Sequence, residues 1–243
     1  MAKFCTKCGK KLEEGKKCDC SKEVTTVKEE TVTTGTNANE IVNSLIDIVK
    51  GIFVKPIDTI KKYADDTNMV LGFILIAINS LITGIMGYLL VKESFASIAS
   101  LFMGDMGSLY ALGGSEVEIP FVKVVGIIFL IMAVYFVVLA FTTYLVSNKL
   151  FKAETTWKKI IATTGVCSAL TSVTSIIGIV CIYISMKVFL IVIGLASMLF
   201  SVYYYHSIKV SSNIDENKQG YTYVSAVAVA LFVAVYLLPK IFG

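Results

Sequence analysis

Residues 160–205 contain a single formal charge, Lys187, and this run constrains the fold more than any other part of the sequence. A helix rises about 1.5 Å per residue, so ~20 apolar residues cover the ~30 Å hydrocarbon core of a bilayer. Segments 160–184 and 188–205 each roughly meet that length, with residues 185–187 as the turn. The run predicts a transmembrane helical hairpin, because a soluble core helix is not apolar on all sides twice in succession.

Three further apolar stretches extend this pattern. They cover 68–91, 121–147 and 221–238, and each is long enough to cross a bilayer. Apolar residues make up 56% of the chain, well above the ~45–50% of an ordinary soluble domain. The sequence therefore predicts an all-α fold, a polytopic membrane helical bundle of five transmembrane helices over 67–243, with a loop at 92–120.

All 22 cationic residues are lysines. Arginine is favoured for bidentate recognition of phosphates and base edges, so its absence argues against nucleic-acid binding. Only four lysines flank the spans on the side opposite the N-terminus, and loops rich in lysine stay in the cytoplasm. This predicts a cell-membrane protein with a cytoplasmic N-terminus and an outside C-terminus. The ten lysines on the N-terminal side are Lys50, Lys55, Lys61, Lys62, Lys149, Lys152, Lys158, Lys159, Lys209 and Lys218.

The segment 1–20 resembles the short zinc ribbon that heads many bacterial membrane proteins. A C-x-x-C-G motif ends at Gly9 and is followed by a C-x-C pair, one residue tighter than the usual C-x-x-C. No secretory signal opens the chain, so these cysteines are expected in the reducing cytoplasm, where such clusters bind metal. Four thiolates make a closed, structural Zn²⁺ site; the alternative is a tail that binds metal adventitiously. The predicted ligands are Cys5, Cys8, Cys18 and Cys20.

Two segments connect the ribbon to the spans. Residues 21–40 are rich in Thr, Glu and Lys and lack aromatic residues, so they predict a disordered linker. Residues 41–66 repeat apolar positions at three- and four-residue steps, which predicts an amphipathic juxtamembrane helix interrupted at Pro56. This helix is expected to rest in the lipid interface. The alternative is that its apolar face packs on the cytoplasmic side of the bundle.

Polar residues inside the predicted spans are small and uncharged. Such residues permit close helix approach and interhelical hydrogen bonds, and the alternative is a polar path for a solute. Packing is favoured, because pumps and carriers usually place ionisable groups at depth, whereas no Asp, Glu, Lys, Arg or His lies deep within these spans. The residues concerned are Asn79, Ser80 and Thr83 in the first span and Ser168, Thr171, Ser172, Thr174 and Ser175 in the third.

No catalytic constellation can be assembled from the sequence. The only histidine, His206, follows the 188–205 stretch and is interpreted as an interfacial anchor. Paired histidines, H-E-x-x-H and a phosphate-binding G-x-x-x-x-G-K loop are absent from the sequence. Cys167 and Cys181 lie about 21 Å apart along one helix, so they are interpreted as packing residues and not as a pair. The sequence predicts that the protein is not an enzyme.

Several of these features together resemble the Yip1-domain membrane proteins. The resemblance covers roughly 45–240 and includes VKPIDTI at 54–60, the long loop after the first span, and KLFK at 149–152 leading into the third span. The family often has a proline early in the third span, where this chain reads TTGVCS at 163–168. Eukaryotic relatives act in vesicle traffic and bind Rab GTPases or other Yip1-type proteins.

The zinc ribbon and the lysine-only composition favour a bacterial type, for which no Rab partner is expected. What the resemblance implies is the fold and a non-enzymatic membrane role. The preferred hypothesis is a scaffold or adaptor that contacts the lipid bilayer and recruits a protein partner through the ribbon or the bundle, and it is compatible with a homo-oligomer. The alternatives are a transporter or permease component with a regulatory ribbon, and a membrane enzyme with unrecognised residues.

Overall fold

The computed structural model describes residues 3–4, 11–12, 38–112 and 120–237, and the chain divides into two compact units, Met1–Asn37 and Ala38–Gly243. In the first unit, strand β1 (Lys3–Phe4) pairs antiparallel with strand β2 (Lys11–Leu12), and Phe4 lies opposite Lys11. The predicted linker up to residue 37 lies outside the described residues. So do the predicted zinc ligands Cys5, Cys8, Cys18 and Cys20.

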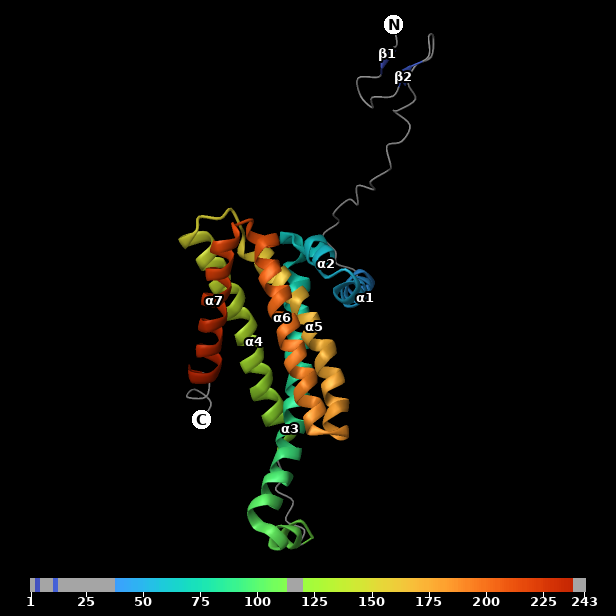
Figure 1. Ribbon diagram of the computed structural model, residues 1–243, viewed down its shortest axis with the longest axis vertical. Coiled ribbons are helices and arrows are strands. Elements are labelled where there is room, and N and C mark those ends of the chain that lie inside the picture. Colours follow the sequence, from blue (N-terminus) through green and yellow to red (C-terminus); the bar gives the residue numbers. More distant parts are fainter. Residues whose placement is uncertain (1–2, 5–10, 13–37, 113–119, 238–243) are drawn as a thin grey trace. The chain divides into compact units, whose positions relative to one another are not determined.

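The second unit is a bundle of long apolar helices, which confirms the predicted all-α membrane architecture (Figure 1). Among the residues that the structure describes, five segments are long and apolar enough to cross a membrane. Helices α5 and α6 form the predicted hairpin and meet at Ser185, and α6 continues beyond the predicted end at Tyr205. The helices are α3 (Met69–Leu112), α4 (Phe121–Leu145), α5 (Trp157–Ile184), α6 (Met186–Ser212) and α7 (Glu216–Phe232), with π-helical turns η2 (Val146–Leu150) and η3 (Val233–Leu237).

Helix α5 is the most enclosed of the spans. In its most apolar window 61% of the residues are buried, against 39% or fewer in each other span. Its sequence is rich in Thr, Ser, Gly and Ala, and such small side chains let α3, α4 and α6 pack against it. The other spans are more exposed, with large apolar side chains such as Leu130, Leu195 and Phe232 that suit contact with lipid.

Helix α3 corrects the predicted loop at 92–120. The helix does not end near Val91 but continues to Leu112, for 44 residues in all, and Figure 1 shows it extending past the ends of α5 and α6. The segment 93–112 contains no proline, and its alanine, leucine and methionine residues favour helix enough to offset Gly104 and Gly107. The first strong helix-breaking signal in the sequence is the glycine pair at 113–114.

Helices α3 and α5 approach so closely that their backbones touch. A Cβ atom on Gly165 would lie 2.4 Å from the carbonyl oxygen of Gly72, and one on Gly72 would lie 2.6 Å from the carbonyl oxygen of Ile161. Only glycine leaves room for this approach, because any side chain would require the two helices to separate. The residues TTGVCS at 163–168 therefore include a backbone contact between helices, at Gly165.

Two short helices precede the spans and confirm the predicted break at Pro56. Helix α1 (Ala38–Val54) begins slightly before the predicted start at 41, and helix α2 (Pro56–Tyr63) leads through the turn η1 (Asp66–Asn68) into α3. One apolar stripe, which includes Ile48 and Ile52, is buried against the bundle, so the packing alternative is observed. A second stripe remains exposed, and its place in the lipid interface stays a prediction. It consists of Val42, Ile46, Val49 and Phe53.

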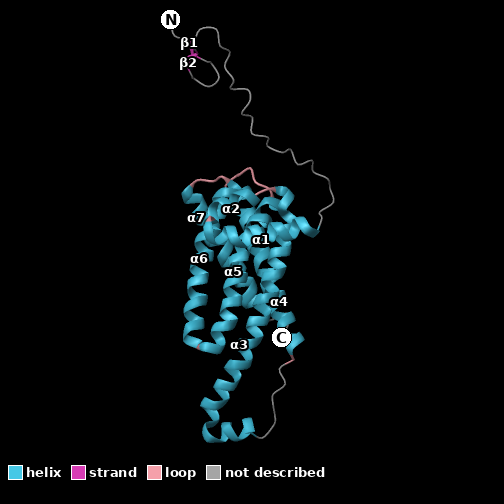
Figure 2. Cartoon of the chain, turned by 90° about the vertical axis from the view of Figure 1, so that its right-hand side faces the viewer, coloured by secondary structure: helices cyan, strands magenta, loops and turns pink. Residues whose placement is uncertain are grey.

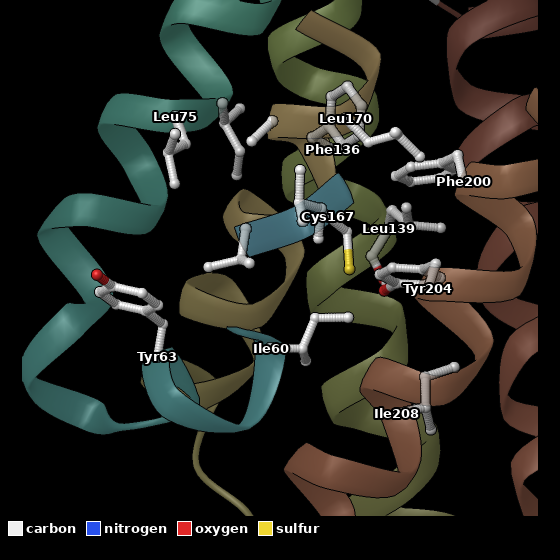
Figure 3. Packing of buried hydrophobic residues seen from close by; sticks show 14 of the residues in the cluster. Ile60, Tyr63, Leu75, Phe136, Leu139, Cys167, Leu170, Phe200, Tyr204 and Ile208 are labelled. Atoms are coloured by element: carbon white, nitrogen blue, oxygen red, sulfur yellow. The ribbon is translucent and has the colours of Figure 1, made fainter. Parts of the chain in front are cut away.

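The main core lies where α1 and α2 pack against α5 and α6, and α3, α4 and α7 also contribute residues to it (Figure 3). The sulfur of Cys167 lies beside Leu139 and Tyr204 in this core. Cys167 and Cys181 are both buried and free, which confirms their interpretation as packing residues.

Candidate functional site: the lysine-rich end of the bundle

Three lysine-bearing flanks meet at one end of the bundle. Helix α1 packs on α5, and α2 packs on both α5 and α6. Figures 1 and 2 both show α1, α2, the α4–α5 connection and the α6–α7 turn at this end. The prediction that these flanks share one end is confirmed, and the cytoplasmic assignment of that end stays a prediction. We call it the lysine-rich end.

A pocket of about 580 Å³ opens at the lysine-rich end between α2, α5 and α6, and we call it the basic pocket. Each of the three flanks supplies one lysine: Lys61 from α2, Lys159 from α5 and Lys209 from α6. His206 adds a fourth nitrogen-bearing side chain, and none of the described residues that line the pocket is acidic. The complete lining is Ile57, Lys61, Lys159, His206, Lys209, Val210 and Asn213.

Acidic side chains close to the basic pocket neutralise it only weakly. The Nζ of Lys209 lies 3.2 Å from Oε1 of Glu216, but both side chains are more than half exposed, and an exposed ion pair contributes little. The carboxylate of Asp65 accepts hydrogen bonds from the backbone N–H and hydroxyl of Thr67, which lower its pKa, with a smaller electrostatic contribution from Lys159. The lining of the basic pocket itself thus carries three lysines and no acidic side chain among its described residues.

The walls of the basic pocket are fixed by local capping. The hydroxyl of Thr156 accepts a hydrogen bond from the backbone N–H of Lys159 at 3.2 Å and so caps the first turn of α5. The same hydroxyl donates to Asp66 in η1, which ties the start of α5 to the entry of α3. Asn213 ends α6 with a φ of 48°, a left-handed conformation that asparagine tolerates. The pocket is thus built on helix ends held by hydrogen bonds.

The elbow between α1 and α2 is held by a separate polar cluster. The carboxylate of Asp47 accepts hydrogen bonds from the Nζ of Lys62 and the hydroxyl of Tyr63, each at 2.8 Å. These two bonds lower the pKa of Asp47, and the bond to Asp47 raises the pKa of Lys62. Gly51 lets the helices close, because a Cβ there would lie 2.3 Å from Oγ1 of Thr59.

The polar residues predicted within the spans are brought together between α3 and α5. Oδ1 of Asn79 accepts hydrogen bonds from the hydroxyls of Thr171 at 2.8 Å and Ser172 at 3.2 Å. Asn79 is fully buried, and its Nδ2 has no partner among the described residues. Ser168 and Ser175 are buried as well. Asn79 thus bonds across the helix contact, while Ser168 bonds to the carbonyl oxygen of Gly165 within α5, as expected for packing.

Tyr204 joins α6 to α4 within the core. Its hydroxyl lies 2.6 Å from Oγ1 of Thr143 and 3.3 Å from the carbonyl oxygen of Leu139. Its ring stacks on Phe200, whose ring in turn meets Phe136 edge to face. The tyrosine run at 203–205 gave no sequence signal that its middle member points inward.

Sequence reasoning missed the basic pocket, because its lysines are far apart in the chain. The available signal was that Lys61, Lys159 and Lys209 each lie near the end of a helix on the same predicted side. His206, interpreted as an interfacial anchor, is exposed and lines this pocket. Within 38–112 and 120–237 no group of three or more His, Cys, Asp or Glu side chains is arranged to hold a metal ion.

Comparison with known proteins places this architecture. No curated protein and no solved structure matched the chain. A family model, the Yip1 domain, matches residues 50–238, from the end of α1 through all five spans. That match covers most of the chain and the whole helical bundle. The chain therefore belongs to the Yip1 domain family.

Proposed function

We propose that this protein is a non-enzymatic membrane scaffold that presents a cytoplasmic zinc ribbon for the recruitment of a protein partner. The observation that carries the proposal is the α3–α5 contact, in which buried Asn79 accepts hydrogen bonds from Thr171 and Ser172. A bundle packed in this way suits holding a partner site at the membrane better than moving a solute through it.

A transport path would have to pass along the residues with polar side chains in α3 and α5. Asn79, Ser172 and Ser175 are 0%, 7% and 4% exposed, and the first two are hydrogen-bonded to each other. Opening a path there would separate helices whose backbones touch at Gly72 and Gly165. This cost argues against a conduit along that interface.

The strand pairing near the N-terminus supports the ribbon. Phe4 and Lys11 lie opposite each other in the β1–β2 ladder, and these two residues flank the segment that carries Cys5 and Cys8. Two thiolates on a connection between paired strands are a common half of a tetrahedral zinc site. The segment has few apolar residues, so the bound metal would supply the folding energy of the ribbon.

Metal analysis of the purified full chain tests the ribbon. We expect about one Zn²⁺ per chain, released in a Cys5→Ser/Cys8→Ser variant and retained in a Cys181→Ser control. The control removes a buried thiol of α5 and leaves the four predicted ligands intact. Wild-type protein without zinc, or equal zinc in both variants, would remove the ribbon from the proposal.

Affinity capture tests the scaffold role. The full chain and the Cys5→Ser/Cys8→Ser variant are expressed at equal levels and crosslinked in membranes before purification. We expect specific partners of the wild type to be lost from the variant, and the Cys181→Ser control to keep them. Recovery of the same proteins from both would show that the ribbon is not the recruiting element.

A further inference from the structure

The basic pocket concentrates positive charge at the level where a phospholipid places its phosphate. Lys159 lies in the first turn of α5, whereas Lys209 lies in the last turn of α6, so both mark the ends of membrane spans. Lys61 lies on α2, just before the η1 turn into α3. Basic pockets between transmembrane helices at a membrane surface are suited to anionic headgroups.

His206, which lines the pocket, stands at the head of an apolar strip on one face of α6. His206, Val202, Leu199 and Leu195 follow one another at three- and four-residue steps and so share one face of this helix. The last three have 52%, 45% and 58% of their surface exposed. From His206 to Leu195 the helix rises about 16 Å, which is about half the hydrocarbon core and therefore the depth of one leaflet.

We propose that the basic pocket binds the phosphate of an anionic phospholipid, whose acyl chains lie along the α6 strip. The charge of Lys61, Lys159 and Lys209 attracts the headgroup, and Ile57 and Val210 supply apolar walls beside it. The exposed strip shares a face of α6 with His206, which favours a lipid over a free phosphate ester that would leave the strip uncovered.

This inference is independent of the scaffold proposal, because it uses no residue of the ribbon. Three lysines are contributed by segments that are distant in sequence, so their convergence depends on the fold of the bundle. Anionic binding at this site would also neutralise charge on Lys209 that its exposed ion pair with Glu216 leaves mostly uncompensated.

The test is native mass spectrometry of the detergent-purified full chain, incubated with equal amounts of phosphatidylglycerol and phosphatidylcholine of identical acyl chains. Wild type is expected to retain one phosphatidylglycerol in preference to phosphatidylcholine. Neutralising the pocket as Lys61→Gln/Lys159→Gln/Lys209→Gln should weaken that retention by about 100-fold, at about fivefold per lysine. A Lys→Arg triple at the same positions keeps the charge and should retain the lipid.

The matched control is Lys149→Gln/Lys152→Gln/Lys158→Gln, which removes three exposed charges from the same end but outside the pocket. It should retain phosphatidylglycerol as the wild type does. Equal loss in both Gln triples, or no loss in the pocket triple, would overturn the proposal. Displacement of the lipid by millimolar glycerol phosphate would overturn the lipid assignment, since the acyl chains would then contribute nothing.

Discussion

The backbone contact between α3 and α5 makes Gly165→Ala the most informative single substitution in the bundle. The new Cβ would lie 2.4 Å from the carbonyl oxygen and 2.5 Å from the Cα of Gly72. An ordinary carbon–oxygen contact is about 3.3 Å, so the helices must separate by roughly 0.9 Å. No rotamer change relieves the clash, because both opposing atoms belong to the backbone.

The magnitude follows from two opposing effects. Overpacking of a tight core costs about 1–3 kcal/mol, and a backbone clash places this site at about 3 kcal/mol. Alanine is a better helix former than glycine by about 1 kcal/mol, which offsets part of that cost. We expect Gly165→Ala to lower the free energy of unfolding by about 2 kcal/mol.

The assay is unfolding of the detergent-solubilised protein by titration with sodium dodecyl sulfate, followed by far-ultraviolet circular dichroism. Gly194→Ala and Gly126→Ala are the controls, because a Cβ at either position meets nothing within 4 Å. Both controls should be neutral or stabilised by up to about 1 kcal/mol. If Gly165→Ala unfolds at the same point as Gly194→Ala, the close contact between α3 and α5 does not exist.

Three further results are expected. Gly72→Ala combined with Gly165→Ala should cost less than the sum of the single substitutions, because one separation of the helices relieves both clashes; strict additivity in the same titration would contradict this. Tyr204→Phe should lower the free energy of unfolding by only about 0.6 kcal/mol, because the hydroxyl of Thr143 still donates to the carbonyl of Leu139 at 2.8 Å. A decrease above about 3 kcal/mol would contradict this expectation. The pKa of Asp47 is lowered by its bonds to Lys62 and Tyr63, so these bonds stabilise the folded protein above about pH 4. This stabilisation is lost as the pH falls through the folded-state pKa, and for so exposed a group it amounts to at most about 1 kcal/mol. Carboxyl NMR should therefore show Asp47 titrating below the usual range, and a titration at or above it would refute the cluster.

The spans could be predicted from the sequence because a long apolar run without charged residues can be recognised from neighbouring residues alone. The hairpin around Ser185 and the helix break at Pro56 each follow from a few adjacent residues. The sequence also predicts which lysine-bearing flanks share one end of the bundle, because each span crosses the membrane completely and successive flanks therefore alternate between the two sides. These features need no knowledge of which helix touches which.

The packing could not be predicted, because a span that is apolar all round gives no signal of its inward face. Gly126, Gly165 and Gly194 all lie within spans, yet only Gly165 meets the backbone of another helix. The continuation of α3 to Leu112 was also missed: the segment 92–120 was predicted to be a loop, although its residues up to Leu112 favour a helix. Convergence of the three lysines of the basic pocket depends on these helix contacts and was therefore hidden as well.

Helix α2 connects the contacts of the lysine-rich end. It has eight residues, too few to be stable as an isolated helix, so its neighbours must hold it. Ile60 is fully buried in the core, Lys61 lines the basic pocket, and Lys62 and Tyr63 bond to Asp47 of α1. Four consecutive residues thus face three different partners. Because Lys61 and Lys62 are adjacent in α2, a change at Asp47 of α1 and a change in the basic pocket both act on the same short helix.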